Sequence, residues 1–219
     1  MKQYADLSDR AITVLCILPT LLALYYYGTP PKETFFLLLL LGWIFFFEWP
    51  CLFSPRSPLF WLIFPLYPTL SFAACLGLIH DPLYHSLIGF MLLLTFAYDG
   101  GGYFIGKAIG RHKLFPALSP NKTIEGALGG FVLAFTACLW YRGSLDPLLI
   151  GKGFIITSIV CVLACTGDMF ESFLKRRVGI KDTGPLLPGH GGLLDRLDAL
   201  LFVVLFFYGA RTYLIAYLH

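Results

Sequence analysis

The sequence predicts an all-α protein that crosses a membrane about seven times and carries a polar site on its cytoplasmic face. Only 13% of the 219 residues are charged and 58% are apolar, whereas a typical globular chain has about 25% charged residues. Seven apolar stretches approach the roughly 20 residues that a helix needs to cross a bilayer. This composition excludes disordered, collagen-like, coiled-coil and secreted disulfide-rich proteins, and a net charge of +3 gives no reason to expect a nucleic-acid partner.

The apolar stretches define the predicted spans, which are residues 11–27, 35–49, 59–79, 83–98, 124–141, 148–166 and 197–218. The first is expected to be a retained helix, because no A-x-A-like signal-peptide cleavage site follows it. Pro65 and Pro68 predict a kink or break in the third, since proline lacks a backbone N–H. The fourth can continue through Gly102, Gly106 and Gly110, whose four-residue spacing lets helices pack closely.

The basic residues indicate how the spans are oriented. If the N-terminus is cytoplasmic and seven helices alternate, 12 of the 16 Lys and Arg residues fall on the cytoplasmic side, as the positive-inside rule requires. These twelve are Lys2, Arg10, Arg56, Lys107, Arg111, Lys113, Lys122, Lys175, Arg176, Arg177, Lys181 and Arg196. We therefore expect an integral protein of the cell (inner) membrane. The six cysteines are scattered and predict neither a zinc site nor a disulfide framework.

Two polar segments, residues 99–125 and 167–198, hold 16 of the 29 charged residues. Two predicted helices separate the segments, so both should lie on the same membrane face. A loop that merely joins two helices needs only a few residues. Long, charged, glycine-rich loops on one face therefore indicate a site.

Three carboxylates in the second segment are candidate metal ligands. Asp168 directly follows an apolar helix, where a carboxylate is costly and usually serves a function. Asp195 and Asp198 lie three residues apart at the start of the last helix, and capping that helix is the alternative role. Together the three could form a hard-oxygen cage for Mg²⁺. Glu171 and Lys175 share a helix face with Asp168 and could form an i,i+4 ion pair.

Basic and glycine-rich elements accompany these carboxylates. Residues 189–192, Gly-His-Gly-Gly, precede a helix, where backbone N–H groups can approach an anion. His190 could be a general acid, a phosphate contact or a hydrogen-bonding loop residue. Side chains suited to phosphate oxygens are Lys175, Arg176, Lys181, Arg196, Lys107, Arg111, Lys122 and Ser119. Membrane anchoring is the alternative for the first segment, and we prefer it for Lys113. Carboxylates interleaved with cations indicate a metal–nucleotide site.

The two polar segments resemble the signature blocks of phosphatidate cytidylyltransferases (CDP-diacylglycerol synthases). Residues 172–198 match the pattern S-x-[apolar]-K-R-x4-K-D-x-[small]-x2-[apolar]-[PGS]-x-H-G-G-x2-D-R-x-D at Ser172, Lys175, Arg176, Lys181, Asp182, His190, Gly191, Gly192, Asp195, Arg196 and Asp198. A second block, D-x-x-A-Y-x-x-G-[KR] followed by S-P-x-K-T-x-E-G, is matched at Asp99, Tyr103, Gly106, Lys107, Ser119, Pro120, Lys122, Thr123, Glu125 and Gly126. Gly102 stands where that family usually has alanine.

The resemblance implies transfer of a cytidylyl group from CTP to phosphatidic acid, giving CDP-diacylglycerol and pyrophosphate, with one or two Mg²⁺ ions. It implies catalytic roles for Asp168, Lys175, Arg176, Lys181, Asp182, His190, Asp195, Arg196 and Asp198. Substrate-binding roles follow for Asp99, Lys107, Arg111, Ser119, Lys122, Ser172, Gly191 and Gly192. The metal ligands would be Asp168, Asp195 and Asp198. Residues 1–98 would then be N-terminal transmembrane helices and residues 99–219 a catalytic transmembrane region. The expected partners are CTP, phosphatidic acid, the lipid bilayer and, in a homodimer, a second copy.

The chemistry of this reaction agrees with the residue types. A phosphate monoester has a second pKa of about 6, so the lipid nucleophile is already ionised near neutrality and no strong general base is needed. The difficulty is the approach of two anions, which metal and basic side chains would neutralise during in-line attack on the α-phosphorus. A polyprenol- or phytol-type lipid kinase is the alternative. A transporter would need charges at mid-depth, whereas these collect on one face.

Overall fold

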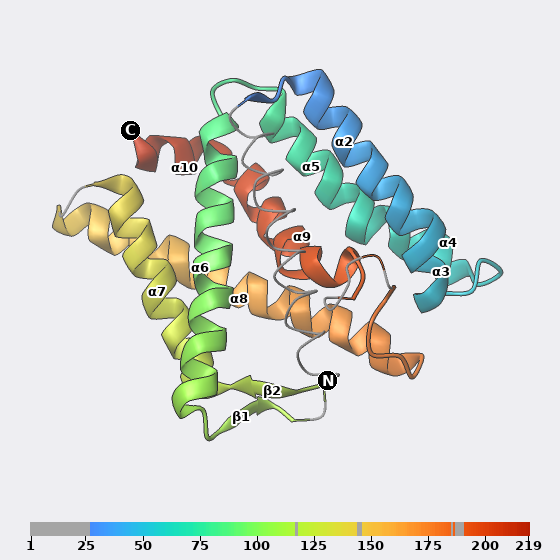
Figure 1. Cartoon of the computed structure of the whole chain (residues 1–219). Helices are drawn as coiled ribbons and strands as arrows, with labels where there is room; N and C mark the ends of the chain where they lie inside the picture. The colour runs from blue at the N-terminus through green and yellow to red at the C-terminus, as the bar shows by residue number, and fades with distance from the viewer. Residues whose placement is uncertain (1–26, 117, 144–145, 185, 187–190) are drawn as a thin grey trace.

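The computed structural model describes residues 27–116, 118–143, 146–184, 186 and 191–219 (Figure 1). Its helices and strands are α2 (Pro30–Trp43), a π-helical turn η1 (Ile44–Glu48), α3 (Trp49–Leu52), α4 (Pro58–Phe64), a second π-helical turn η2 (Pro65–Thr69), α5 (Leu70–Ile79), α6 (His85–Ile109), β1 (Lys113–Phe115), β2 (Ser119–Thr123), α7 (Ile124–Arg142), α8 (Pro147–Arg177), α9 (Leu194–Gly209) and α10 (Arg211–Leu218). The predicted span at residues 11–27 and His190 lie outside the described residues, apart from Tyr27.

The helical membrane fold predicted from the sequence is confirmed. Among the described residues, the stretches long and apolar enough to cross a membrane are Pro30–Leu52, Pro58–Ile79, His85–Ile109, Ile124–Arg142 and Pro147–Arg177. The pair α9 and α10 would make a sixth span if the two count as one. The protein is therefore a polytopic membrane protein, while the total of seven spans stays a prediction.

The last predicted helix, residues 197–218, is wrong as a continuous element. α9 ends at Gly209, α10 begins at Arg211, and the two helices are bent by 84° relative to each other. Arg211 donates from Nη1 to the carbonyl oxygen of Tyr208 at 2.8 Å, which stabilises this corner. Apolar residues continue through the bend, so hydropathy does not reveal it. At η2 the prediction from Pro65 and Pro68 is confirmed, since the regular α-helix is interrupted there.

The first polar segment contains an antiparallel hairpin that the all-α prediction omitted. β1 pairs with β2, with Lys113 opposite Thr123 and Phe115 opposite Ser119. The Glu125 carboxylate, in the first turn of α7, accepts hydrogen bonds from the backbone N–H groups of Arg111 and His112. These bonds join the start of α7 to the segment between α6 and β1.

Glycines bring α6 and α7 together above this hairpin. A Cβ on Gly101 would lie 2.9 Å from the Gly129 carbonyl oxygen, and one on Gly106 would lie 3.5 Å from the Gly126 Cα. α6 continues to Ile109, as the glycine spacing predicted. Close packing fixes the ends of both helices, and these ends carry the hairpin.

α9 packs against α5, α6 and α8 in the middle of the described bundle (Figure 1). Its Val203 and Phe207 belong to a core that includes Phe90 and Val160 of α6 and α8. Leu194, at its first turn, belongs to a second core with Trp49, Phe60 and Tyr67. The polar start of α9 is therefore held between the N-terminal spans and α8.

Candidate active site

Both polar segments meet at a cavity of about 490 Å³ beside the hairpin. The cavity is lined by Tyr98, Asp99, Gly102, Tyr103, Leu114, Ser119, Asn121, Lys122, Thr123, Gly126, Ala127, Asp168 and Arg196. Five of these residues were predicted site residues, namely Asp99, Ser119, Lys122, Asp168 and Arg196. The expectation that the two segments share one face is confirmed by this common lining.

An ion pair between Lys122 and Asp168 joins the two segments directly. The side chains, from β2 and α8, are 28% and 25% exposed. Ser172, one helical turn beyond Asp168, donates a long hydrogen bond of 3.4 Å to its carboxylate. Burial lowers the pKa of Lys122, but the neighbouring acidic groups, with Asp168 foremost, together outweigh burial and raise it. The ammonium group therefore stays charged at neutral pH beside the cavity.

Three carboxylates at this end of the bundle influence one another through their charges, namely those of Asp99, Asp168 and Asp198. The negative charges of Asp168 and Asp99 act on the Asp198 carboxyl group. The positive charges of Lys122 and Arg196 act on that of Asp99. Crowded carboxylates repel one another, and carboxylate oxygen is the ligand type that Mg²⁺ prefers. The donor chemistry therefore fits a divalent cation. Within the described ranges, however, no three Asp, Glu, His or Cys side chains are arranged to hold a metal ion.

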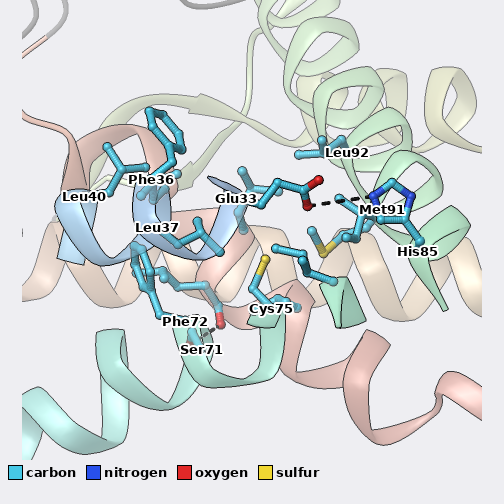
Figure 2. Close-up of a pocket in the computed structure, with 16 residues that line it drawn as sticks. Glu33, Phe36, Leu37, Leu40, Ser71, Phe72, Cys75, His85, Met91 and Leu92 are labelled. Atoms are coloured by element: carbon cyan, nitrogen blue, oxygen red, sulfur yellow. Dashed lines mark hydrogen bonds and ion pairs between the residues drawn. The ribbon is translucent and has the colours of Figure 1, made fainter. Parts of the chain in front are cut away.

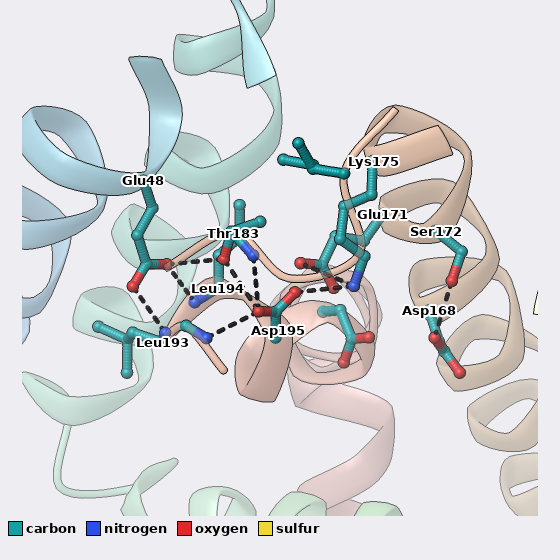
Figure 3. A network of polar contacts seen from close by, with 12 residues as sticks. Glu48, Asp168, Glu171, Ser172, Lys175, Thr183, Leu193, Leu194 and Asp195 are labelled. Carbon is teal, nitrogen blue, oxygen red and sulfur yellow. Dashed lines mark hydrogen bonds and ion pairs between the residues drawn. The ribbon is translucent and has the colours of Figure 1, made fainter. Parts of the chain in front are cut away.

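Asp195 belongs to a separate hydrogen-bonded network, next to the cavity but not lining it (Figure 3). Its Oδ1 accepts from Lys175 Nζ at 2.7 Å. Its Oδ2 accepts from the backbone N–H groups of Gly192 and Thr183, at 2.7 and 2.9 Å. Lys175 Nζ also lies 3.6 Å from Glu171 Oε1, which confirms the predicted i,i+4 pair. These bonds hold the segment that precedes α9 and do not cap the helix itself, so the capping role and the metal-ligand role of Asp195 both stay predictions.

Glu48 is part of the same network, although no motif indicated it. This carboxylate, 1% exposed, accepts from the backbone N–H groups of Leu193 and Leu194 at 2.7 Å each. It also lies 3.2 Å from the Thr183 hydroxyl oxygen and 3.2 Å from Trp43 Nε1. The available signal was one carboxylate at the end of the apolar run 35–47. Apart from Trp43, five residues before it, its partners lie 135 to 146 residues further along the chain.

The described glycines of the Gly-His-Gly-Gly run allow this close packing. Gly191 has φ of +83°, a left-handed conformation that favours glycine. A Cβ on Gly192 would overlap the Thr183 hydroxyl and approach the Glu48 carboxylate. Their predicted role as substrate contacts stays a prediction, as does that of His190.

The other predicted basic residues lie away from the cavity lining. Lys107 sits 5.7 Å above the ring of Tyr103, which does line the cavity. Arg176 donates from Nη1 to the Ile180 carbonyl oxygen at 3.0 Å, at the end of α8. The remaining ones, Arg111, Lys113, Lys181 and the acidic Asp182, are exposed. The substrate roles of Lys107, Arg111, Arg176, Lys181 and Asp182 stay predictions, and Lys113 was expected to anchor the chain at the membrane.

Comparison with known proteins shows the family of the chain. Residues 1–214 match the model of the cytidylyltransferase family. The chain belongs to this family. It is 38% identical over 170 residues to the phosphatidate cytidylyltransferase of Haemophilus influenzae, covering 71% of this chain and 58% of that protein.

Other members of the family give similar values. The Bacillus subtilis phosphatidate cytidylyltransferase is 43% identical over 122 residues, 55% of this chain and 45% of that protein. The Helicobacter pylori enzyme is 43% identical over 138 residues, 63% of this chain and 51% of that protein. The chain thus spans about half the length of the curated relatives it matches.

Proposed function

We propose that this protein is a phosphatidate cytidylyltransferase that makes CDP-diacylglycerol and pyrophosphate from CTP and phosphatidic acid. The observation that carries the proposal is the Lys122–Asp168 pair, which brings both signature segments to one charged cavity beside the membrane. Relatives at about 40% identity bear this name. We further propose that the cavity faces the cytoplasm, as the distribution of basic residues predicts.

The reaction joins two anions. An oxygen of the lipid phosphate attacks the α-phosphorus of CTP, a new P–O bond forms, and the bond to the β-phosphate oxygen breaks to release pyrophosphate. Lys122 and Arg196 line the cavity and would draw the triphosphate and the lipid phosphate together. Lys107, in the last turn of α6, and Arg111, between α6 and β1, are exposed and would attract the lipid head group.

A divalent cation, Mg²⁺ in our prediction, belongs to this proposal. Asp168 and Asp198 would hold it, with Asp99 as a further donor, because carboxylate oxygen is the ligand type that Mg²⁺ prefers, and binding would require these side chains to draw together. When bound, Mg²⁺ would supply positive charge against the phosphates. Asp195 would join this set only if its bonds to Lys175 and Thr183 rearranged.

Labelled CTP tests the reaction directly. The full chain, purified in detergent, is incubated with phosphatidic acid or, in a parallel reaction, with a polyprenol. CTP is labelled at either the α- or the γ-phosphate, with dCTP, ATP and UTP as competitors. We expect the α-label in the lipid product and the γ-label in pyrophosphate. A γ-label in the lipid would instead identify a lipid kinase, and no label in the lipid from either CTP would contradict both activities.

A further inference from the structure

The first turn of α9 depends on a hydrogen-bond acceptor from another helix. The first four N–H groups of an α-helix have no partner within the helix. A Ser, Thr, Asp or Asn side chain usually accepts from them, but Leu193 stands at this position and makes no side-chain cap. Asp195 reaches back to Gly192 N–H, and so leaves the N–H groups of Leu193 and Leu194 to other acceptors.

Glu48, at the end of η1, supplies those acceptors. Its two carboxylate oxygens take one N–H each, at 2.7 Å, and the side chain is 1% exposed. A carboxylate at a helix N-terminus also complements the helix dipole. Glu48 ends the π-helical turn η1, a kind of turn that is frequent at functional sites.

Thr183 connects Glu48 to the signature residues. Its hydroxyl oxygen lies 3.2 Å from Glu48 Oε2 and 3.1 Å from Asp195 Oδ2 (Figure 3). Asp195 in turn holds Lys175 of α8. The next residue after Asp195 is Arg196, which lines the cavity. The position of Glu48 is therefore coupled to the positions of the side chains at the start of α9.

We propose that Glu48 is a positioning residue for the site, because it fixes the start of α9 and thereby the place of Arg196 at the cavity. The inference rests on the proposed function, since its effect is measured as cytidylyl transfer. Glu48 touches none of the cavity lining residues through the bonds described here, so it acts through α9 and Thr183.

The test is the Glu48→Gln variant, which keeps the side-chain volume but replaces one acceptor oxygen with an N–H donor. We expect kcat to fall about 10²-fold, the loss that a misplacement of about 1 Å can cause. KM for CTP should change less than kcat, because Lys122 and Ser119 of the hairpin are untouched and only Arg196 is displaced. Amide exchange at residues 192–198 should speed up, while exchange in the middle of α8 should not.

Glu33→Gln is the matched control. Glu33 is also a buried glutamate of the span Pro30–Leu52, but it lies at the opposite end, 3.8 Å from His85 Nε2. It lines an apolar cavity of about 180 Å³ between α2, α5, α6 and α9 (Figure 2). This variant should keep the wild-type kcat. An equal loss in both variants would mean that removing any buried glutamate from this span is damaging, and would overturn the proposal.

Thr183 provides the decisive pair if Glu48→Gln does not fold. Thr183→Val removes the bridging hydroxyl at constant shape, and should lower kcat about tenfold, by the net value of one hydrogen bond to a charged group. Thr183→Ser should restore it. Wild-type kcat in Thr183→Val or a folded Glu48→Gln, in an assay where the wild type is active, overturns the positioning role. A wild type that makes no CDP-diacylglycerol overturns the proposed function instead.

Discussion

The cavity and the Glu48–Asp195 network both adjoin the start of α9, yet their carboxylates differ in exposure and in hydrogen-bond partners. Asp168, at the cavity, is 25% exposed and pairs with Lys122. The Asp195 side chain is 4% exposed and both its oxygens are occupied by protein donors. Asp195 and Arg196 are consecutive, and only the second lines the cavity. Neighbouring signature residues can thus lie in different surroundings, one held within the protein and the other beside the cavity.

Asp195→Asn should have the largest effect, and on stability first. It removes the nearer of the two carboxylate partners of the buried Lys175 ammonium, since Glu171 lies at 3.6 Å, and breaking a buried pair costs up to about 3–5 kcal/mol. We expect a lower thermal midpoint in detergent together with lost activity. If the variant unfolded at the wild-type temperature and lost only activity, Asp195 would act on the reaction and the contrast with Asp168 would be wrong.

Asp168→Asn should show the opposite pattern. Activity should fall about 10²- to 10³-fold, as when one preorganised charge-stabilising group is removed, while the partly exposed pair with Lys122 adds at most about 1 kcal/mol to stability. Assays of cytidylyl transfer and thermal unfolding on the same preparation separate the two effects.

Asp146→Asn is the control for this variant, since Asp146 caps the other end of α8 by accepting from Leu148 N–H at 2.8 Å. Asparagine is an equally good cap, so activity and stability should both persist. Near-normal activity of Asp168→Asn would remove the cavity from the mechanism.

Gly192→Ala should have the smallest effect of the three. It should lower the free energy of unfolding by about 1–3 kcal/mol, the usual cost of an added methyl group in a packed site. The methyl group would push against Thr183 and Glu48, so the thermal midpoint should fall. Gly151→Ala is the control, because a Cβ there meets nothing within 4 Å. Equal midpoints for the two variants would show that the network tolerates displacement.

Hydropathy and spacing predicted the membrane helices and the common face of the two polar segments. The reason is that lipid requires long apolar runs wherever the chain crosses it, and charged residues collect where it does not. The pairing of Lys122 with Asp168 and the burial of Asp195 were beyond sequence reasoning. Spacing places side chains on a helix face, but the partner across the bundle depends on tertiary packing.

Two further features had no usable signal. The bend between α9 and α10 interrupts a run that stays apolar throughout, so no change in hydropathy marks it. In the sequence, Glu48 looks like the polar end of an ordinary span. Two of the groups that it binds are the backbone amides of Leu193 and Leu194. Every residue except proline has a backbone N–H group, so a bond to that group requires no particular residue type and produces no sequence motif.

The reach of Glu48 across the bundle has a consequence for exchanging parts between relatives. A chimaera that joined foreign N-terminal helices to residues 99–219 of this chain would retain all matched signature positions. It would nevertheless begin α9 with two amide groups facing no acceptor, unless the foreign segment brought an equivalent carboxylate to the same place. A working chimaera must therefore combine residues 99–219 with an N-terminal segment that carries Glu48 or an equivalent carboxylate.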